Sequence, residues 1–211
     1  MLKRGLYHMS QPNQITDIAA LEALYGAPAK ASQIKVTDHL IPTYAAWIAR
    51  SRFCILTTVG DAGTDGSPRG DDGPVVKIQD PKTLLMPDWR GNNRMDSLRN
   101  IVSDGRVSLL FMVPGSNNVM RVNGTAIVSV APDLLSQFSD KGRMPRSVIV
   151  VSIAEVYSQC ARALMRSRTW TSGDESEGLP TVGQMLAEIE TGFNGAAYDA
   201  DWGARADKTM W

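Results

Sequence analysis

Short runs of β-branched and apolar residues, joined by tight turns, constrain the fold of this chain more than any other feature. The connections at 80–82 and 114–118 are too short for a helical crossover, so the strands that they join are expected to be antiparallel. About six such strands with few helices between them are typical of a mostly antiparallel barrel. The runs occupy residues 53–59, 75–79, 83–86, 106–113, 119–130 and 147–157.

Helical spacing of apolar residues occurs mainly outside these runs, and it predicts several helices that surround the sheet. The expected helices cover 17–25, a segment from Pro42, 93–102, a segment from Pro132, 160–165 and 179–189. Residues 61–73 are dense in Gly, Asp, Ser and Pro, which predicts a long loop or an irregular hairpin. The polar residues 1–14 are expected to form an arm, and no period is evident after residue 191.

We therefore expect one structural domain with three segments. Residues 1–50 would supply an arm and helices that pack on the barrel. Residues 51–170 would form the barrel core, and residues 171–211 a C-terminal loop and helix.

The overall charge excludes one class of partner. Lys plus Arg and Asp plus Glu each number 22, so the formal net charge is zero. Nucleic-acid binding needs a basic surface and is not expected here.

No run approaches the roughly 18 apolar residues of a membrane span, so we expect no membrane partner and a cytoplasmic location. Cys54 and Cys160 lie far apart without a CxxC pair, so we expect no disulfide and no metal site.

The segment Gly91-Asn92-Asn93-Arg94 has the chemistry of an anion site. Glycine permits close backbone approach, and the asparagines tolerate turn geometry while offering amide groups. We expect Arg94 in the first turn of a helix, beside free N–H groups that favour phosphate. A cation in a first turn opposes the helix dipole, and a bound anion would resolve that conflict. A solvated Arg94 in an ordinary turn is the alternative.

Six sequence words occur in an order that resembles a known family. The sequence is similar to the FMN-dependent branch of the pyridoxamine 5'-phosphate oxidase-like superfamily over roughly residues 50–170. The resemblance implies a mostly β split barrel with peripheral helices, a homodimer with FMN at the subunit interface, and a small-molecule substrate. The words are SPRGD (67–71), PDWRGNNR (87–94), DSLRNI (96–101), LLFMVPG (109–115), RVNG (121–124) and RSRTW (166–170).

The resemblance also implies which residues bind the cofactor. The residues expected around the FMN phosphate are Arg69, Asn92, Asn93, Arg94 and Ser97. Those expected beside the ribityl chain and the isoalloxazine ring are Pro87, Asp88, Val76, Lys77, Arg121, Asn123 and Trp170. Within this set Lys77 is a candidate partner for the polar edge of the ring or for substrate, and Trp170 is expected to cap the ring from the partner subunit. No catalytic residue and no metal ligand are assigned.

The resemblance to the oxidase proper is incomplete. The spacing from Arg69 to Lys77 is longer than in the oxidase, and no Arg/His substrate-binding signature follows Trp170. We therefore expect an FMN-dependent oxidoreductase that acts on another, unidentified small molecule. The alternative is a non-catalytic flavin-binding carrier or sensor. Relatives also bind heme or the deazaflavin F420, but two histidines leave little scope for heme, and no basic residues beyond Arg94 are expected for the F420 tail.

Overall fold

The computed structural model describes residues 13–139 and 142–209, so most of the predicted arm lies outside the described residues. The chain divides into two units, Met1–Lys35 and Val36–Trp211. In the first unit, helix α1 (Ile18–Tyr25) begins at Asp17, whose carboxylate accepts a hydrogen bond from the N–H of Ala20, and helix α2 (Lys30–Ile34) follows. That all segments form one structural domain stays a prediction.

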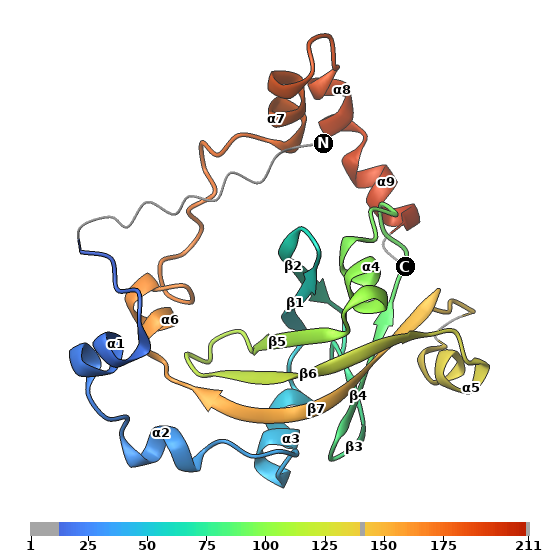
Figure 1. The fold of residues 1–211 in the computed structure, drawn as a ribbon. Coiled ribbons are helices and arrows are strands. Elements are labelled where there is room, and N and C mark those ends of the chain that lie inside the picture. The colour runs from blue at the N-terminus through green and yellow to red at the C-terminus, as the bar shows by residue number, and fades with distance from the viewer. Residues whose placement is uncertain (1–12, 140–141, 210–211) are drawn as a thin grey trace. The chain divides into compact units, whose positions relative to one another are not determined.

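The second unit contains a seven-stranded sheet in the order β2-β1-β5-β6-β7-β4-β3 (Figure 1). Every neighbouring pair is antiparallel. The strands are β1 (Phe53–Gly60), β2 (Gly63–Gly70), β3 (Lys77–Asp80), β4 (Thr83–Asp88), β5 (Arg106–Met112), β6 (Val119–Ser129) and β7 (Ser147–Gln159).

The sheet curls on itself, because β2 and β4 approach each other although β1, β5, β6 and β7 lie between them in the sheet order. Arg69 on β2 and Asp88 at the end of β4 form an ion pair across this closure. Alternate residues of the strands fill the enclosed core, as Leu56 on β1 and Leu109 and Phe111 on β5 illustrate. The predicted mostly β split barrel with peripheral helices is confirmed.

Helices lie outside the sheet, as expected for this architecture. Helix α4 packs against β1, β2 and β6, and its Ile101 enters the core. None of the described helices has the length and apolar character that a membrane span needs. The helices of this unit are α3 (Pro42–Ile48), α4 (Asp96–Ser103), α5 (Pro132–Leu135), the 3₁₀ turn η1 (Ser136–Phe138), α6 (Arg162–Ser167), α7 (Val182–Ile189), α8 (Gly195–Ala200) and α9 (Trp202–Thr209).

The structure corrects the interpretation of residues 61–73. This segment is not an irregular hairpin, because Gly63–Gly70 pairs with β1 without a register shift. Its composition hides the strand, since an edge strand that exposes alternate residues can accommodate Pro68 and several glycines. The same segment raises the strand number from the expected six to seven. Helices α2, α8 and α9 also had no clear sequence pattern.

Candidate functional site

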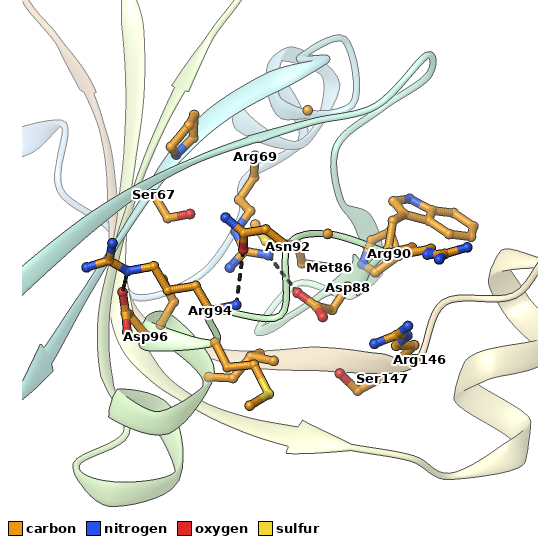
Figure 2. A pocket seen from close by; sticks show the side chains of 18 of the residues that line it. Ser67, Arg69, Met86, Asp88, Arg90, Asn92, Arg94, Asp96, Arg146 and Ser147 are labelled. Atoms are coloured by element: carbon orange, nitrogen blue, oxygen red, sulfur yellow. Dashed lines mark hydrogen bonds and ion pairs between the residues drawn. The ribbon is translucent and has the colours of Figure 1, made fainter. Parts of the chain in front are cut away.

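A cleft of about 970 Å³ opens between β2, the end of β4 and the start of α4 (Figure 2). This volume lies within the roughly 300–1,000 Å³ that is common for ligand sites. Its walls come from residues 65–72 with Val75, the segment 86–98, and Arg146 and Ser147, where β7 begins. The cleft therefore joins three segments that are distant in the sequence.

The β2 wall carries polar side chains because the strand alternates. Asp65, Ser67 and Arg69 are half-buried, whereas Gly66 and Pro68 between them are exposed. Residues two apart in a strand point to the same face, so the three polar side chains share one face. All three also line the cleft.

An ion pair connects two residues in the lining of the cleft. Arg69 Nη1 donates to Asp88 Oδ1 at 2.7 Å, and the side chains are only 20% and 16% exposed. Within the described part of the chain, Arg69 Nε is buried and has no hydrogen-bond partner. The guanidinium group therefore retains an unused, buried donor at Nε after pairing with Asp88.

The turn before α4 has an unusual backbone. Asn93 and Met95 both have positive φ, 61° and 59°, a region in which asparagine is tolerated and methionine is rare. The N–H of Arg94 donates to Asn92 Oδ1 at 3.0 Å. Residues held in this region cluster at ligand sites, where surrounding structure enforces them.

Helix α4 begins at Asp96, not at Asn93, so Arg94 precedes the first turn. The predicted conflict between Arg94 and the helix dipole is therefore wrong, since the first turn carries Asp96 and an acidic residue is favourable there. Arg94 Nε donates to Asp96 Oδ2, and this hydrogen bond raises the pKa of Arg94. The N-cap residue Met95 has no side-chain oxygen with which to cap the helix.

Three further hydrogen bonds connect the walls of the cleft. Ser97 Oγ donates to Asp65 Oδ2 at 3.1 Å, which joins α4 to β2. Trp89 Nε1 donates to Asp71 Oδ2 at 2.8 Å, which joins the segments that follow β4 and β2. The third bond, from Arg146 to Asn93, joins the start of β7 to the turn before α4.

The cleft brings together seven of the twelve residues that the sequence assigned to the cofactor: Arg69, Pro87, Asp88, Asn92, Asn93, Arg94 and Ser97. The other five do not line it: Val76, Lys77, Arg121, Asn123 and Trp170. Val76 is buried in the core, and Lys77 is exposed at the start of β3.

The three predicted residues farthest along the chain have contacts elsewhere. Arg121 and Asn123 do share one face of β6, where they donate to the side chains of Tyr157 and Glu155 on β7. Trp170 lines a separate cavity of about 220 Å³ and donates from Nε1 to the carbonyl of Ser116 at 2.8 Å.

Sequence reasoning missed two arginines of the cleft, Arg90 and Arg146. Arg90 lies within the segment 87–94, but no sequence pattern assigned it to the ligand. Arg146 lies far from it in sequence, and the pairing of Asp88 with Ser147 places it there. The expectation that no further basic residues cluster near Arg94 for an F420 tail is wrong, because Arg90 and Arg146 line the same cleft.

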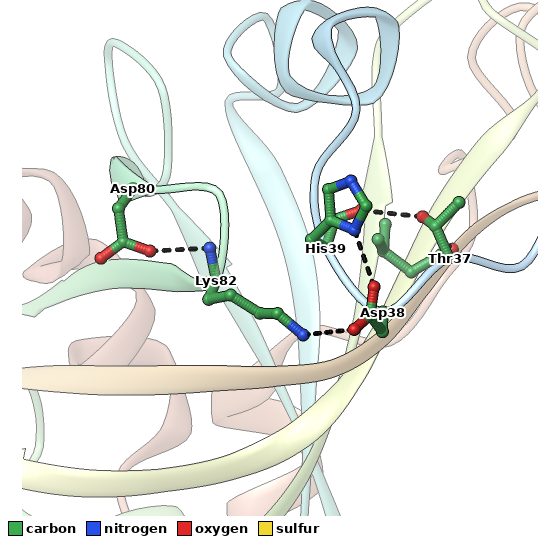
Figure 3. Close-up of polar contacts among 6 residues, drawn as sticks. Thr37, Asp38, His39, Asp80 and Lys82 are labelled. Carbon is green, nitrogen blue, oxygen red and sulfur yellow. Dashed lines mark hydrogen bonds and ion pairs between the residues drawn. The ribbon is translucent and has the colours of Figure 1, made fainter.

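A second polar cluster lies beside the turn between β3 and β4 (Figure 3). Asp38 Oδ1 bonds His39 Nδ1 at 2.7 Å, and Lys82 Nζ donates to Asp38 Oδ2 at 2.6 Å. These contacts, His39 first, lower the pKa of Asp38 to about 2. The backbone N–H of Leu40 donates to the carbonyl of Pro81, so the cluster anchors the segment before α3 to this turn.

Comparisons with solved structures find similar proteins of low sequence identity. A putative pyridoxamine 5'-phosphate oxidase from Lactobacillus delbrueckii is 19% identical, with a TM-score of 0.46, and the match covers 57% of this chain and 95% of that chain. HupZ from Group A Streptococcus is 14% identical, with a TM-score of 0.47, over 56% of this chain and 94% of that one. An FMN-binding protein from Syntrophomonas wolfei is 10% identical, with a TM-score of 0.42, over 67% and 96%.

No curated protein matches the sequence. The sequence model of one family, described as pyridoxamine 5'-phosphate oxidase, matches residues 40–160. The match covers more than half of the 211 residues and contains β1 to β7 and all of the cleft lining. This chain therefore belongs to the pyridoxamine 5'-phosphate oxidase family.

Proposed function

We propose that the protein binds FMN in the cleft and is an FMN-dependent oxidoreductase. The observation that carries the proposal is the convergence of Arg69, Asn92, Asn93 and Arg94 around the uncapped start of α4. Free N–H groups at a helix start and nearby guanidinium groups are the donors that bind phosphate in proteins. Membership of the family supports the same conclusion.

The residues present fit a phosphorylated flavin. Arg69 has an unused buried donor at Nε, and the side chain of Arg94 is 80% exposed, so it can exchange Asp96 for a phosphate oxygen. Pro87 and Asp88 follow along β4 and would lie beside the ribityl chain. Arg69 would keep its place through the ion pair to Asp88 while its Nε donates to the ligand.

Bound FMN would supply the redox chemistry, which is a hydride or electron transfer to a small organic molecule. The role of the chain is to hold and orient the cofactor and to exclude water from one of its faces. The Trp89–Asp71 hydrogen bond narrows one side of the cleft and would contribute to that exclusion.

We also propose a homodimer, in which a second copy completes the site. Three of the predicted residues support this, because Arg121, Asn123 and Trp170 lie outside the cleft of their own subunit and would reach FMN only in a neighbouring one. Tyr157 and Arg121 form a polar, aromatic surface on the outside of β6 and β7 that could receive a partner. Sedimentation velocity should give twice the mass of the chain, and a monomer at micromolar concentration would refute the dimer.

Titration of FMN and riboflavin, followed by quenching of flavin fluorescence, tests the cofactor assignment. The Arg94→Ala variant should bind FMN about tenfold or more weakly, since a hydrogen bond to a charged group contributes roughly 1.5–3 kcal/mol. Riboflavin affinity should change little. The control Arg99→Ala removes an exposed arginine of α4 outside the cleft and should leave both affinities unchanged. Equal losses for FMN and riboflavin would refute the phosphate role.

A second experiment separates an enzyme from a carrier or sensor. The FMN-loaded protein is mixed anaerobically with NADH or NADPH and with a panel of small organic donors, and bleaching of the flavin absorbance is followed. Oxygen or an organic acceptor is then added. Repeated reduction and reoxidation at catalytic rates is the expected result. Stable FMN binding without turnover across the panel would favour the non-catalytic alternative.

A further inference from the structure

The arginines that line the cleft differ in how they are neutralised. Arg69 pairs with Asp88, and Arg94 pairs with Asp96. In the part of the chain that the structure describes, Arg90 and Arg146 have no ion pair with a carboxylate. The uncompensated positive charge of the cleft therefore lies on these two residues, neither of which the sequence analysis assigned to a ligand.

Arg146 is held in position by two contacts. Its Nη1 donates to Asn93 Oδ1 at 2.7 Å, and its backbone N–H donates to the carbonyl of Asp88 at 3.1 Å. Since Oδ1 of Asn93 is the acceptor, both hydrogens on Nδ2 of that residue point away from Arg146 and can serve a ligand. Arg90 is exposed and follows Asp88 by two residues. Figure 2 shows Arg90 and Arg146 at one end of the cleft and Arg94 with Asp96 at the other.

The carboxylates of the cleft do not cancel this charge locally. Four arginines and five aspartates line the cleft, so its net charge does not favour an anion. The pairing of these charges does favour one, because Asp88 and Asp96 pair with Arg69 and Arg94, and none of the five carboxylates forms an ion pair with Arg90 or Arg146 among the described residues. Asp65 accepts from Ser97 and Asp71 accepts from Trp89, while Asp72 lies 3.8 Å from Arg52 outside the cleft.

We propose that Arg90 and Arg146, together with Asn93, form an anion-binding subsite for a phosphate or carboxylate group. The charge of Arg94 is already neutralised by Asp96, whereas an anion at Arg90 and Arg146 meets two guanidinium groups that have no carboxylate partner among the described residues. The identity of the anion rests on the proposed function. It is an anionic group of the substrate or, if the phosphate of FMN lies at this end of the cleft and not at Arg94, that phosphate.

Calorimetric titration of the ligand-free protein with inorganic phosphate at low ionic strength tests the subsite itself. The Arg90→Gln/Arg146→Gln double variant should bind phosphate at least about tenfold more weakly than the unmodified protein, in line with the loss of two charge-assisted contacts. The Arg90→Lys/Arg146→Lys variant keeps the charge and should recover part of the affinity. The control Arg99→Gln removes one exposed arginine of α4 outside the cleft and should not change it. Undiminished phosphate binding by the double Gln variant, or no binding by the unmodified protein, would overturn the subsite.

Two further titrations identify the source of the anion. If the double Gln variant loses its preference for FMN over riboflavin, the subsite holds the phosphate of the cofactor. If that preference is retained and the FMN-loaded protein still binds inorganic phosphate through these arginines, the subsite holds an anionic substrate group. If the protein binds phosphate through these arginines but binds neither FMN nor riboflavin, the proposed function is refuted and the anion-binding subsite is retained.

Discussion

The ion pair between Arg69 and Asp88 should make a measurable contribution to folding. The pair joins β2 to β4 across the closure of the barrel, and both side chains are at least four-fifths buried. The Asp88→Asn variant removes the acceptor charge and leaves a guanidinium group whose Nε already has no partner among the described residues. Breaking a fully buried pair costs roughly 3–5 kcal/mol, and the remaining exposure of this pair reduces the expected loss to about 1–3 kcal/mol.

Urea denaturation followed by tryptophan fluorescence measures this loss. For a chain of this size, about 2 kcal/mol corresponds to a fall of roughly 4–8 °C in the midpoint of thermal unfolding. The Arg69→Gln/Asp88→Asn double variant replaces both charges and should be more stable than the sum of the single losses predicts. The Asp72→Asn control removes a 3.8 Å contact between exposed side chains and should leave the midpoint unchanged. An Asp88→Asn midpoint equal to that of the unmodified protein would refute the reasoning.

Three further predictions concern other parts of the fold. The pKa of Asp38 is lowered to about 2. The contribution of this carboxylate to stability is therefore present above the unfolded pKa near 3.8 and is lost as the pH falls through 2. NMR titration of the carboxyl group should show the low pKa, and the pKa should rise in the Lys82→Ala variant. A thiol reagent at pH 8 should modify exposed Cys160 and spare Cys54, whose pKa burial raises to about 12; mass spectrometry of labelled peptides showing equal modification would contradict this. Gly124→Ala should lower the melting temperature by several degrees, because a Cβ there would lie 2.0 Å from a carbonyl oxygen of β7, and an unchanged melting temperature would count against this packing.

Local sequence patterns were sufficient for most of the barrel. Runs of β-branched and apolar residues predicted β1, β5 and β7, whose buried residues form the core, and Pro42 predicted the start of α3. Strand β2 was not predicted because its stability comes from pairing with β1. Intrinsic β-propensity says little about an edge strand with polar and glycine residues. Helices α8 and α9 were not predicted because neither has apolar residues at regular helical spacing.

The candidate site was predictable where it is continuous in sequence. The turn Asn92–Arg94 and Arg69 lie within recognisable words, and they meet in the cleft. Arg146 could not be found in this manner, since it reaches the cleft through the pairing of β4 with β7. For Arg121 and Asn123 on β6, the sequence pattern established which face of the strand they share, but it could not show what that face contacts.

Strand β2 forms one wall of the cleft, yet the hydrophobic core cluster of the described residues includes none of its side chains. A substitution at Ser67 therefore alters the cleft-facing surface without opening a cavity in the interior. Asp65 and Arg69 on the same strand differ from Ser67, because the hydrogen bond from Ser97 to Asp65 and the ion pair of Arg69 with Asp88 also connect β2 to α4 and β4. Mutational drift at Ser67 can alter the cleft while the barrel persists, which makes this position, and not the whole strand, the natural place to randomise in directed evolution of this scaffold.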